Sequence, residues 1–362
     1  MTLLSGKTVD RKRVLTPFSI GGVQLASPVV QAALSGYSDL PMRVLARHYG
    51  AAYTLCEVLL DTFIAVIGTN RKNLARIAVS DDEHPVGGQL MGANPDDFAP
   101  AARRLVEAGF DVIDINFGCP VKKVLGRCRG GYLLGVPETA LEIVSRVRAA
   151  VPAHVPVTLK MRRGIDDSPE SVEKFWTIFD GAFDRGAAAI TVHGRSVQQK
   201  YVGPSSWEFL TAVKRHAGQR IVIGSGDLFS AEACVAMMRE TGVDGVSVAR
   251  GAIGNPWIFR QTLALFSGGP ALPPPTVHEQ RDVLREHFRL SQNLHGEQIA
   301  GRTMRKFAIK YARLHPEPLA VRDAFIAVKV NADWQAVLDR FYAVDAPGRD
   351  ASAEVDETAE CA

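Results

Sequence analysis

The sequence predicts a closed (β/α)8 barrel, the TIM-barrel fold, followed by a C-terminal helical domain. Between residues 28 and 251, eight short apolar runs rich in β-branched residues alternate with helical patterns, which indicates a parallel sheet. Eight such units favour a closed barrel over an open doubly wound sheet, and no GxGxxG follows the first strand. With 362 residues and 46% hydrophobic content, the chain can form one large α/β domain and a smaller one.

The expected strands follow one another at the spacing of a barrel. In chain order they are residues 28–34, 51–58, 85–92, 112–118, 156–162, 188–194, 220–226 and 245–251. Apolar residues recur at helical spacing in three intervening segments, 96–109, 137–151 and 230–242. The first and the last of these end on glycine, which commonly terminates a helix. We therefore expect the barrel domain to span residues 17–266.

The composition changes after this domain. Residues 267–276 form a Pro/Gly-rich linker, and residues 277–343 show helical patterns without a strand pattern. Residues 344–362 carry six acidic groups and one arginine, so we expect a disordered acidic tail, with residues 1–16 as an N-terminal extension. The net charge of +3 becomes +8 without this tail, which permits a polyanionic partner.

The composition disfavours several classes of protein and site. No stretch approaches the roughly 18 apolar residues of a membrane span, and the basic N-terminus lacks the apolar segment of a signal peptide. We therefore expect a cytoplasmic protein that does not bind membranes. We also expect it to be a monomer. The five cysteines show no CxxC or Cys/His zinc spacing, which argues against both disulfides and a bound metal.

Polar side chains collect at the expected C-terminal ends of the strands, where barrel enzymes place their catalytic groups. They are Gln89, Asn116, Cys119, Lys160, Arg162, His193, Arg195, Ser225, Asp227 and Arg250. One or two of them would fit satisfied polar groups of a core, but ten at one rim indicate a site. Glycines flank Ser225 and follow Arg250, at the place where barrels commonly bind phosphate through backbone N–H groups. We therefore expect a ligand that carries a phosphate.

Lys160 is compatible with two kinds of chemistry. It could form a Schiff base, or it could place a cation against an electron-rich cofactor ring. Arg162 shares its strand face, and two neighbouring cations without an acid nearby in sequence fit the stabilisation of an anion such as a reduced flavin. We favour this second role and keep the nucleophilic lysine as the alternative.

Residues 114–131, DINFGCPVKKVLGRCRGG, place a thiol on a basic loop. Cys119 lies between a glycine and a proline in a turn at a strand end, which presents the thiol instead of packing it. A thiol with a pKa of about 8.5 is mostly protonated at neutral pH, so it can donate a proton as well as act as a nucleophile. Cys56 and Cys234 fit small core residues, while Cys128 has only a loop context.

One stretch of the expected helical domain is strongly basic. Arg302, Lys306, Lys310 and Arg313 are spaced so that they share one helical face. Taken alone, such a run fits a solvated charged surface better than a binding site.

Together these patterns resemble the tRNA-dihydrouridine synthases, FMN-dependent enzymes that reduce particular uridines in tRNA. The resemblance extends from about residue 17 to residue 342. It is carried by AALSGYSDLPMR, GGQLMG, DINFGCPVKKV, VTLKMRRG, ITVHGRS, IGSGD and VARGAIGNPWIF, with HGEQIAGRTMRKF in the helical part. Their order and spacing are far more specific than a lone Gly-Cys-Pro. The resemblance implies an FMN-binding barrel, a helical tRNA-binding domain and NADPH as the reductant.

The resemblance also implies roles for individual residues. Those expected at FMN are Ala33, Leu34, Ser35, Gln89, Lys160, His193, Ser225, Gly226, Asp227, Ala249, Arg250 and Gly251. Those expected at the RNA are Asn116, Arg162 and Arg195 in the uracil pocket, with Arg305 and Lys306 in the helical domain. Because of their charge, Lys122, Lys123 and Arg127 beside the thiol are also expected at the RNA backbone. Cys119 would be the proton donor.

In the reaction that this family implies, a hydride passes from reduced FMN to C6 of uracil, and Cys119 protonates C5. Ala33 and Leu34 stand where family members usually have Pro-Met, and Ser225 stands where they have Asn, so we expect weaker FMN binding. Two alternatives stay open: a small-molecule FMN barrel of the dihydropyrimidine or dihydroorotate dehydrogenase type, and an RNA-binding relative without turnover. The basic helical domain argues against the first, because a free pyrimidine needs no such surface.

Overall fold

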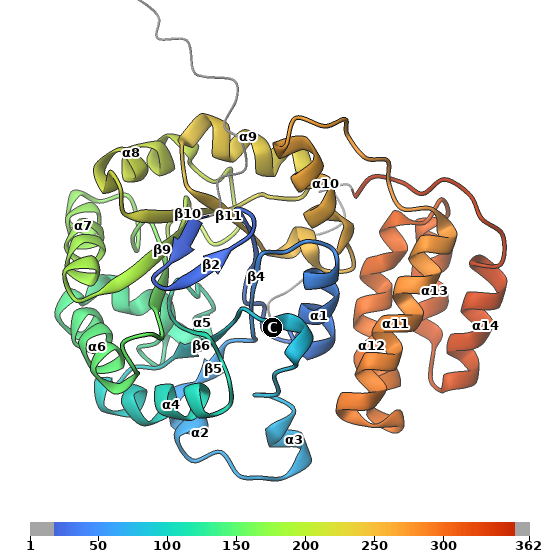
Figure 1. Cartoon of the computed structure of the whole chain (residues 1–362), viewed down its shortest axis with the longest axis horizontal. Helices are drawn as coiled ribbons and strands as arrows, with labels where there is room; N and C mark the ends of the chain where they lie inside the picture. The colour runs from blue at the N-terminus through green and yellow to red at the C-terminus, as the bar shows by residue number, and fades with distance from the viewer. Residues whose placement is uncertain (1–17, 352–362) are drawn as a thin grey trace, which may run out of the picture.

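The computed structural model describes residues 18–351, which form a barrel ringed by helices and a helical bundle beside it (Figure 1). The predicted N-terminal extension, residues 1–16, and residues 352–362 of the predicted tail lie outside the described residues. Within residues 18–351, no helix is both long enough and apolar enough to cross a membrane.

Eight parallel strands form the barrel, as the sequence predicts. They are β3 (Val29–Gln31), β4 (Tyr53–Leu55), β6 (Val86–Met91), β7 (Val112–Phe117), β8 (Val157–Arg162), β9 (Ala187–His193), β10 (Ile221–Ser225) and β11 (Gly245–Val248). Each pairs in parallel with its neighbours, and the pairing of β4 with β6 completes the ring. Every strand lies within its predicted run, except that β9 begins one residue earlier.

Three short strands were not predicted. β1 (Phe18–Ile20) and β2 (Val23–Leu25) form an antiparallel hairpin across a Gly-Gly turn, in which Gly21 has a φ of +59°. A Cβ on Gly21 would lie 3.1 Å from Pro156, next to the start of β8, so the hairpin sits at the N-terminal end of the barrel. β5 (Leu59–Leu60) adds a two-residue pairing to the edge of β6.

Helices cover the outside of the barrel (Figure 1). They are α1 (Leu40–His48), α2 (Asp61–Ala65), α3 (Arg71–Leu74), α4 (Pro95–Glu107), α6 (Pro137–Ala150), α7 (Pro169–Asp184), α8 (Trp207–Ala217), α9 (Ala231–Thr241) and α10 (Trp257–Phe266). The short α5 (Lys122–Leu125) lies instead in the loop that follows β7. Polar N-caps such as Ser168 and Ser230 start them by accepting a backbone N–H. Gly242 ends α9 in the left-handed conformation, as glycine does most readily.

The C-terminal part of the described chain is helical. It contains α11 (Val277–His295), α12 (Glu297–Tyr311), α13 (Pro318–Ala327) and α14 (Asn331–Phe341). Thr276 and Glu279 form a capping box at the start of α11, directly after the Pro/Gly-rich segment. Trp334 packs against Phe288 and Phe325, with ring centroids 4.8 and 5.0 Å apart, and this contact joins α14 to α11 and α13.

The helical bundle is fixed to the barrel by polar and aromatic contacts. The edge of Tyr37 meets the ring of Phe307 at a centroid distance of 5.5 Å, and Arg260 pairs with Glu279 at 2.8 Å. The buried Arg313 donates to the carbonyl of Ile253 at 2.5 Å. These contacts hold the bundle against α10 and against the loops that follow β3 and β11.

The start of the predicted disordered tail is held against the bundle. The backbone N–H of Val277 donates to the carbonyl of Ala346 at 2.9 Å, and the N–H of Arg349 donates to Leu314 at 2.8 Å. The N–H of His278 donates to the Asp345 carboxylate at 2.9 Å. Residues 345–349 therefore run along the start of α11, because backbone hydrogen bonds hold them there despite their polar composition.

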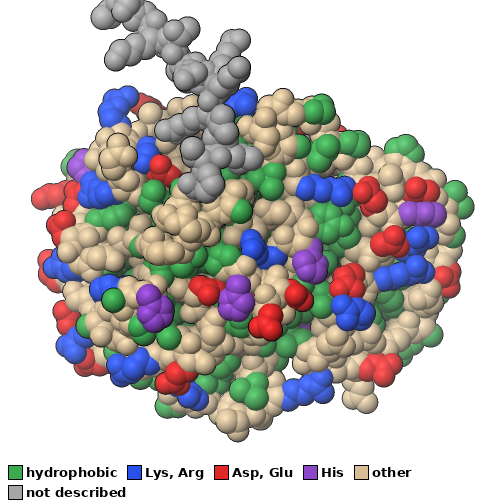
Figure 2. Space-filling model, in the orientation of Figure 1, with side chains coloured by type: hydrophobic (Ala, Val, Ile, Leu, Met, Phe, Trp, Pro, Cys, Tyr) green, Lys and Arg blue, Asp and Glu red, His purple; other side chains and the backbone are tan. Residues whose placement is uncertain are grey.

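Figure 2 shows one face of the molecule, seen in the orientation of Figure 1. Acidic and basic side chains are interspersed over this face. This mixed pattern is typical of an ordinary solvated protein surface.

Candidate active site

The alternation of side chains along the strands brings the predicted polar residues into one space at the C-terminal end of the barrel. Asn116 of β7 lies opposite Lys160 of β8, and Arg162 of β8 lies opposite His193 of β9. His193 in turn lies opposite Ser225 of β10. These five side chains thus come from four neighbouring strands and line one end of the barrel.

Two amides connect the interior of the barrel to the turn that carries Cys119. The Asn116 Nδ2 donates to the Gln89 Oε1 at 2.8 Å, and the Gln89 Nε2 donates to the Asp114 Oδ2 at 2.6 Å. The Asn116 Oδ1 accepts the backbone N–H groups of Gly118 and Cys119 at 3.0 and 3.1 Å. The predicted residues Gln89 and Asn116 are therefore brought together with Cys119.

The turn around Cys119 presents its side chain half-buried at the barrel opening. The carbonyl of Cys119 accepts the N–H of Gly131 at 3.0 Å, which ties the turn to the end of its loop. Gly130 has a φ of +58°, and a Cβ there would lie 2.8 Å from the Cys119 Cβ. Only glycine fits at position 130, because both the backbone conformation and the space exclude a side chain.

The other described cysteines differ from Cys119 in burial. Cys56 and Cys234 are fully buried, and burial raises the pKa of each thiol to about 12. Such thiols stay protonated and lack access to solvent, so they are not reactive groups. Cys128 is exposed on the basic loop, with a φ of +56°.

The opening has a surplus of positive charge. Desolvation and, after it, the nearby charge of Arg162 lower the pKa of Lys160, and the charge of Asp114 acts in the opposite direction, which leaves the pKa at about 8. Burial also lowers the pKa of Arg162 to about 10. Cations crowded in this way fit an anionic ligand, which would offset their mutual repulsion.

His193 is neutral in this setting. Burial, followed by the charges of Arg162 and Lys160, holds its pKa well below the ordinary value. Its Nδ1 accepts the backbone N–H of Arg195 at 3.1 Å, so the ring proton stays on Nε2. His193 can therefore donate one hydrogen bond to a ligand.

The ends of β10 and β11 form a second polar region. Asp227 has a φ of +55°, and its carboxylate accepts from Arg195 at 2.7 Å and from the N–H of Ser205 at 2.9 Å. The Arg250 guanidinium carbon lies 4.8 Å from the ring centroid of Tyr201 and 4.9 Å from that of Phe229. The two rings hold this partly exposed guanidinium beside the strand ends, where it can bind an anion.

The remaining predicted cofactor residues flank this region. Ala33, Leu34 and Ser35 follow β3, and the N–H of Leu34 donates to the Ser38 hydroxyl at 2.8 Å. Ala249 and Gly251 follow β11, which pairs directly with β3. The two segments therefore lie side by side at the opening, although they are far apart in sequence.

Arg162 and Arg195 are buried and are largely held by backbone carbonyls. Arg162 donates to the carbonyls of Gly118, Ser196 and Lys200 at 2.8 to 3.0 Å. Arg195 donates to the carbonyl of Gly203 as well as to Asp227, but its buried Nη1 has no hydrogen-bond partner among residues 18–351. An unpaired buried donor at this opening is a further observation that fits a polar ligand.

The predicted basic residues are divided between solvent and the joint between the two domains. Lys122 and Lys123 are exposed on α5, and Arg305 is exposed on α12. Lys306 instead donates to the carbonyl of Gly36 and lies 5.2 Å from the Tyr37 ring centroid.

The basic residues 302–313 do not form one exposed face, which corrects the prediction. Arg302 is exposed, but Arg313 is 7% exposed and lies in the 3₁₀ turn after α12, against the barrel. Arg302, Lys306 and Lys310 do lie in one helix, as their spacing predicts. The end of α12 at Tyr311 and the docking of Arg313 on Ile253 remove the last residue from this face.

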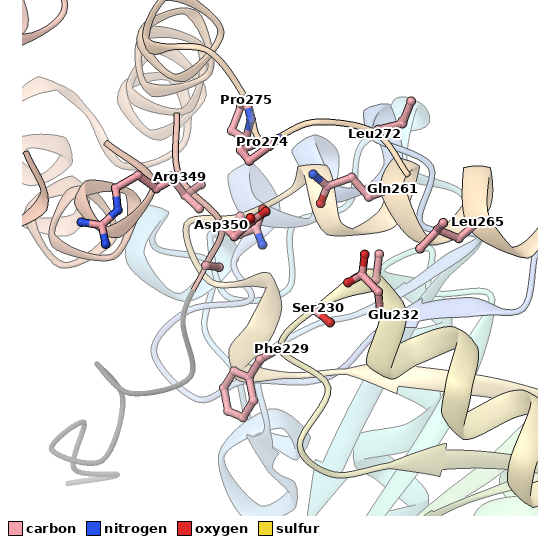
Figure 3. Close-up of a pocket in the computed structure, with 14 residues that line it drawn as sticks. Phe229, Ser230, Glu232, Gln261, Leu265, Leu272, Pro274, Pro275, Arg349 and Asp350 are labelled. Carbon is pink, nitrogen blue, oxygen red and sulfur yellow. The ribbon is translucent and has the colours of Figure 1, made fainter. Parts of the chain in front are cut away.

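A separate pocket of about 220 Å³ lies outside the barrel (Figure 3). Its walls include Ser230 and Glu232 of the α9 start, Gln261 of α10 and residues 349–351. None of the predicted site residues lines it. Within residues 18–351, no group of three or more His, Cys, Asp or Glu side chains could hold a metal ion.

Sequence reasoning missed Asp114 among the residues that build this site. Asp114 and Asn116 are two residues apart in a strand and therefore share its inward face. The alternating pattern VIDINF already contained this information.

Comparison with known proteins identifies the family. The dihydrouridine synthase family model matches residues 30–344. A probable tRNA-dihydrouridine synthase of Mycobacterium tuberculosis is 36% identical over 344 residues, which cover 92% of this chain and 87% of the relative. The tRNA-dihydrouridine synthase B of Xanthomonas axonopodis pv. citri is 35% identical over 327 residues, which cover 90% and 92%.

The chain belongs to the dihydrouridine synthase family. Solved structures share the fold of this family member. Histamine dehydrogenase from Rhizobium sp. 4-9 has a TM-score of 0.55 at 16% identity, with 81% of this chain and 51% of that chain covered. Morphinone reductase in complex with tetrahydroNAD has a TM-score of 0.51 at 14% identity, with 72% and 92% covered. At such low identity these two structures support the barrel fold alone.

Proposed function

We propose that this protein reduces specific uridines of tRNA to 5,6-dihydrouridine, with FMN as its cofactor and NADPH as the reductant. FMN, once bound and reduced, supplies the hydride for C6 of uracil, and Cys119 donates the proton to C5. The observation that carries the proposal is the half-buried Cys119 thiol at a polar opening rich in cations. Membership of the dihydrouridine synthase family supports the same reaction.

The residues at the opening fit FMN. Arg250, partly exposed between two aromatic rings, would bind the phosphate, and Lys160 would place its charge against the reduced ring. The proposed binding set is Ala33, Leu34, Ser35, Gln89, Lys160, His193, Ser225, Gly226, Asp227, Ala249, Arg250 and Gly251. Asp227 would act through Arg195, because its carboxylate is already paired with that side chain.

The uracil would lie against Asn116, Arg162 and Arg195. Three backbone carbonyls hold the Arg162 guanidinium in place, so its charge is fixed before a substrate arrives. A fixed cation stabilises negative charge that develops on a uracil carbonyl without a cost of reorganisation. Cys119 then needs only to hold its proton within reach of C5.

The tRNA would contact the helical domain, residues 277–343, and the loop that carries the thiol. Lys122 and Lys123 are exposed on α5, directly after the Cys119 turn, and Arg305 is exposed on α12. Lys306 would act at the joint between the domains, where it contacts Gly36. We propose that the protein acts as a monomer in the cytoplasm, where it would meet tRNA.

The RNA surface can be tested by the salt dependence of tRNA affinity. Replacing Lys122 and Lys123 by alanine should lower the slope of log affinity against log salt by about two, because about one counterion is released for each phosphate contact. The matched control replaces Arg103 and Arg215, two exposed arginines on α4 and α8, and should leave the slope unchanged. Equal slopes in both double variants would remove α5 from the RNA surface.

The proposed reaction can be tested with the reduced protein. Its bound flavin is identified by chromatography, and the anaerobically reduced protein is then mixed with unmodified tRNA or with free uracil. We expect the bound flavin to be FMN, and we expect tRNA but not free uracil to reoxidise it. Reoxidation by free uracil and not by tRNA would indicate the small-molecule reaction. A protein that binds tRNA but carries no flavin would indicate the role without turnover.

A further inference from the structure

Asp114 is a buried carboxylate inside the barrel that the proposed reaction does not use. Its side chain is 1% exposed, and its Oδ1 accepts the Thr158 hydroxyl at 2.5 Å while its Oδ2 accepts the Gln89 Nε2 at 2.6 Å. A buried carboxylate is costly unless hydrogen bonds compensate for its lost hydration. We therefore asked which groups this carboxylate, which shares β7 with Asn116, holds in place.

The hydrogen bonds from Asp114 to Cys119 have a fixed direction. An ionised carboxylate only accepts, so Gln89 must turn its Nε2 toward Asp114 and its Oε1 toward Asn116. Asn116 must then turn its Nδ2 toward Gln89, which leaves its Oδ1 facing the backbone. There it accepts the two N–H groups of Gly118 and Cys119.

The groups at both ends of this series of hydrogen bonds require the same orientation of the two amides. The backbone N–H groups of the turn can only donate, and the carboxylate at the other end can only accept, so neither amide can flip without breaking bonds at both ends. The three links are buried: Asp114 is 1% exposed, Gln89 is 0% exposed and Asn116 is 6% exposed. Water is therefore a poor substitute for any lost partner.

We propose that Asp114 is a positioning residue that fixes the Cys119 turn through the side-chain amides of Gln89 and Asn116. The same carboxylate orients Gln89, a residue of the proposed cofactor site. Asp114 therefore fixes Gln89 and the proposed proton donor, Cys119, relative to each other. The positioning of the turn follows from the hydrogen bonds alone, and its catalytic meaning rests on the proposed function. Asp114 itself does not reach the reacting atoms.

The positioning can be tested without any assay of activity. Iodoacetamide alkylates accessible thiols, and mass spectrometry of peptides gives a separate rate for each cysteine of the full-length protein. Asp114→Ala removes the acceptor, so the Cys119 turn should open more often and Cys119 should react about five- to tenfold faster, the factor that one hydrogen bond contributes to such an equilibrium. Cys234, buried in α9, should stay protected and reports global unfolding.

Two control variants separate positioning from a general loss of packing. Asp114→Asn keeps an oxygen for Gln89, while Thr158 can rotate its hydroxyl to accept from the new amide, so the Cys119 rate should return to that of the wild type. Thr158→Val removes the other hydrogen bond of the same carboxylate but leaves the path to Asn116 intact, so it should also leave the rate unchanged.

Additivity supplies the decisive result. Asn116→Ala should raise the alkylation rate of Cys119 as Asp114→Ala does. Cys119 in the double variant should react no faster than in Asn116→Ala alone, because both substitutions break the same series of hydrogen bonds. Equal rates in the wild type and Asp114→Ala, or additive effects in the double variant, would overturn the proposal. If Cys234 becomes reactive in Asp114→Ala, Gln89→Leu breaks the middle link instead, and an unchanged Cys119 rate there would overturn it equally.

The outcome is independent of the proposed function. A faster Cys119 reaction in Asp114→Ala supports the positioning even if the protein leaves tRNA unchanged. If the protein does reduce tRNA, Asp114→Ala should lower kcat and change KM much less. Asp114→Asn should restore most of the lost kcat, because it returns an oxygen that accepts from Gln89.

Discussion

The two ends of this barrel differ in the side chains that their strands direct into the interior. At the N-terminal end, Ile20 and Leu25 of the hairpin pack with Val30, Val112 and Ile223 in one apolar cluster. At the C-terminal end the inward side chains are polar or charged, as in Asn116, Lys160 and His193. One strand, β7, contributes to both ends, since it starts with Val112 and continues through Asp114 to Asn116.

Within a single strand, the residues at one end thus contribute to stability and those at the other end contribute to the candidate site. Side chains alternate along a strand, so a six-residue strand turns three of them into the barrel. In β7 the first of these three is apolar and the next two are polar. Substitutions at the hairpin end should therefore change the free energy of unfolding, and substitutions at the opposite end should change ligand binding and turnover.

The largest effect is expected at Cys119. Cys119→Ala should lower turnover on tRNA by about 10² to 10⁴, the usual contribution of a general acid, while FMN binding and flavin reduction by NADPH stay as in the wild type. Cys128→Ala is the matched control on the same loop and should be nearly normal. The two half-reactions are measured separately by stopped flow. A dead Cys128→Ala beside an active Cys119→Ala would assign the acid to Cys128.

The next effect is expected at the opposite end of the barrel. Ile20→Ala removes a buried side chain of the apolar cluster and should lower the free energy of unfolding by about 2 to 5 kcal/mol. Chemical denaturation measures this value, and titration with FMN at low denaturant should give an unchanged affinity. Loss of FMN binding with unchanged stability would contradict the division between the two ends.

A smaller effect is expected at Arg250, the residue proposed to bind the phosphate of FMN. Arg250→Ala should weaken FMN binding by about 10- to 100-fold, because hydrogen bonds to a charged group contribute about 1.5 to 3 kcal/mol. Equilibrium dialysis of the flavin measures the change, and Arg239→Ala, on the exposed side of α9, serves as the control. A variant at position 250 that keeps all of its flavin after dialysis would refute the phosphate assignment.

The smallest effect is a dependence of stability on pH. Burial raises the pKa of Asp114 from 3.8 to about 6, so the folded protein keeps this proton over a range in which the unfolded chain has lost it. The stability of the wild type relative to Asp114→Asn should therefore fall as pH rises from about 4 to about 6. Denaturant unfolding of the flavin-free proteins measures both curves. Parallel curves would show that Asp114 titrates as an exposed carboxylate does.

The barrel and most of its opening were predictable from sequence because both depend on local patterns. Strand alternation with helix gives the eight parallel strands, and closure then requires their C-terminal ends to meet. The positions of Gln89, Lys160 and Arg250 at the opening follow from that geometry. The glycine that ends α9 follows instead from the helical pattern of residues 230–242. The family resemblance, carried by ordered motifs, added the expected cofactor and the expected substrate.

The features that were missed either are too short to show a sequence pattern or depend on contacts between distant segments. Strands of three residues around a Gly-Gly turn are too short for a recognisable alternation, so β1 and β2 escaped prediction. Helical spacing groups Arg313 with Lys306, but only the packed structure shows that the barrel covers Arg313. Residues 345–349 are polar, yet backbone hydrogen bonds to the bundle hold them in place.

We propose that the polar end of the barrel reduces uridine in tRNA. The most direct test incubates the purified protein with unmodified tRNA and NADPH without oxygen, and compares the NADPH consumed with the dihydrouridine formed. We expect one dihydrouridine for each NADPH oxidised, and almost none with Cys119→Ala. A flavin-loaded protein that binds tRNA and is reduced by NADPH, but leaves every uridine unchanged, would contradict it.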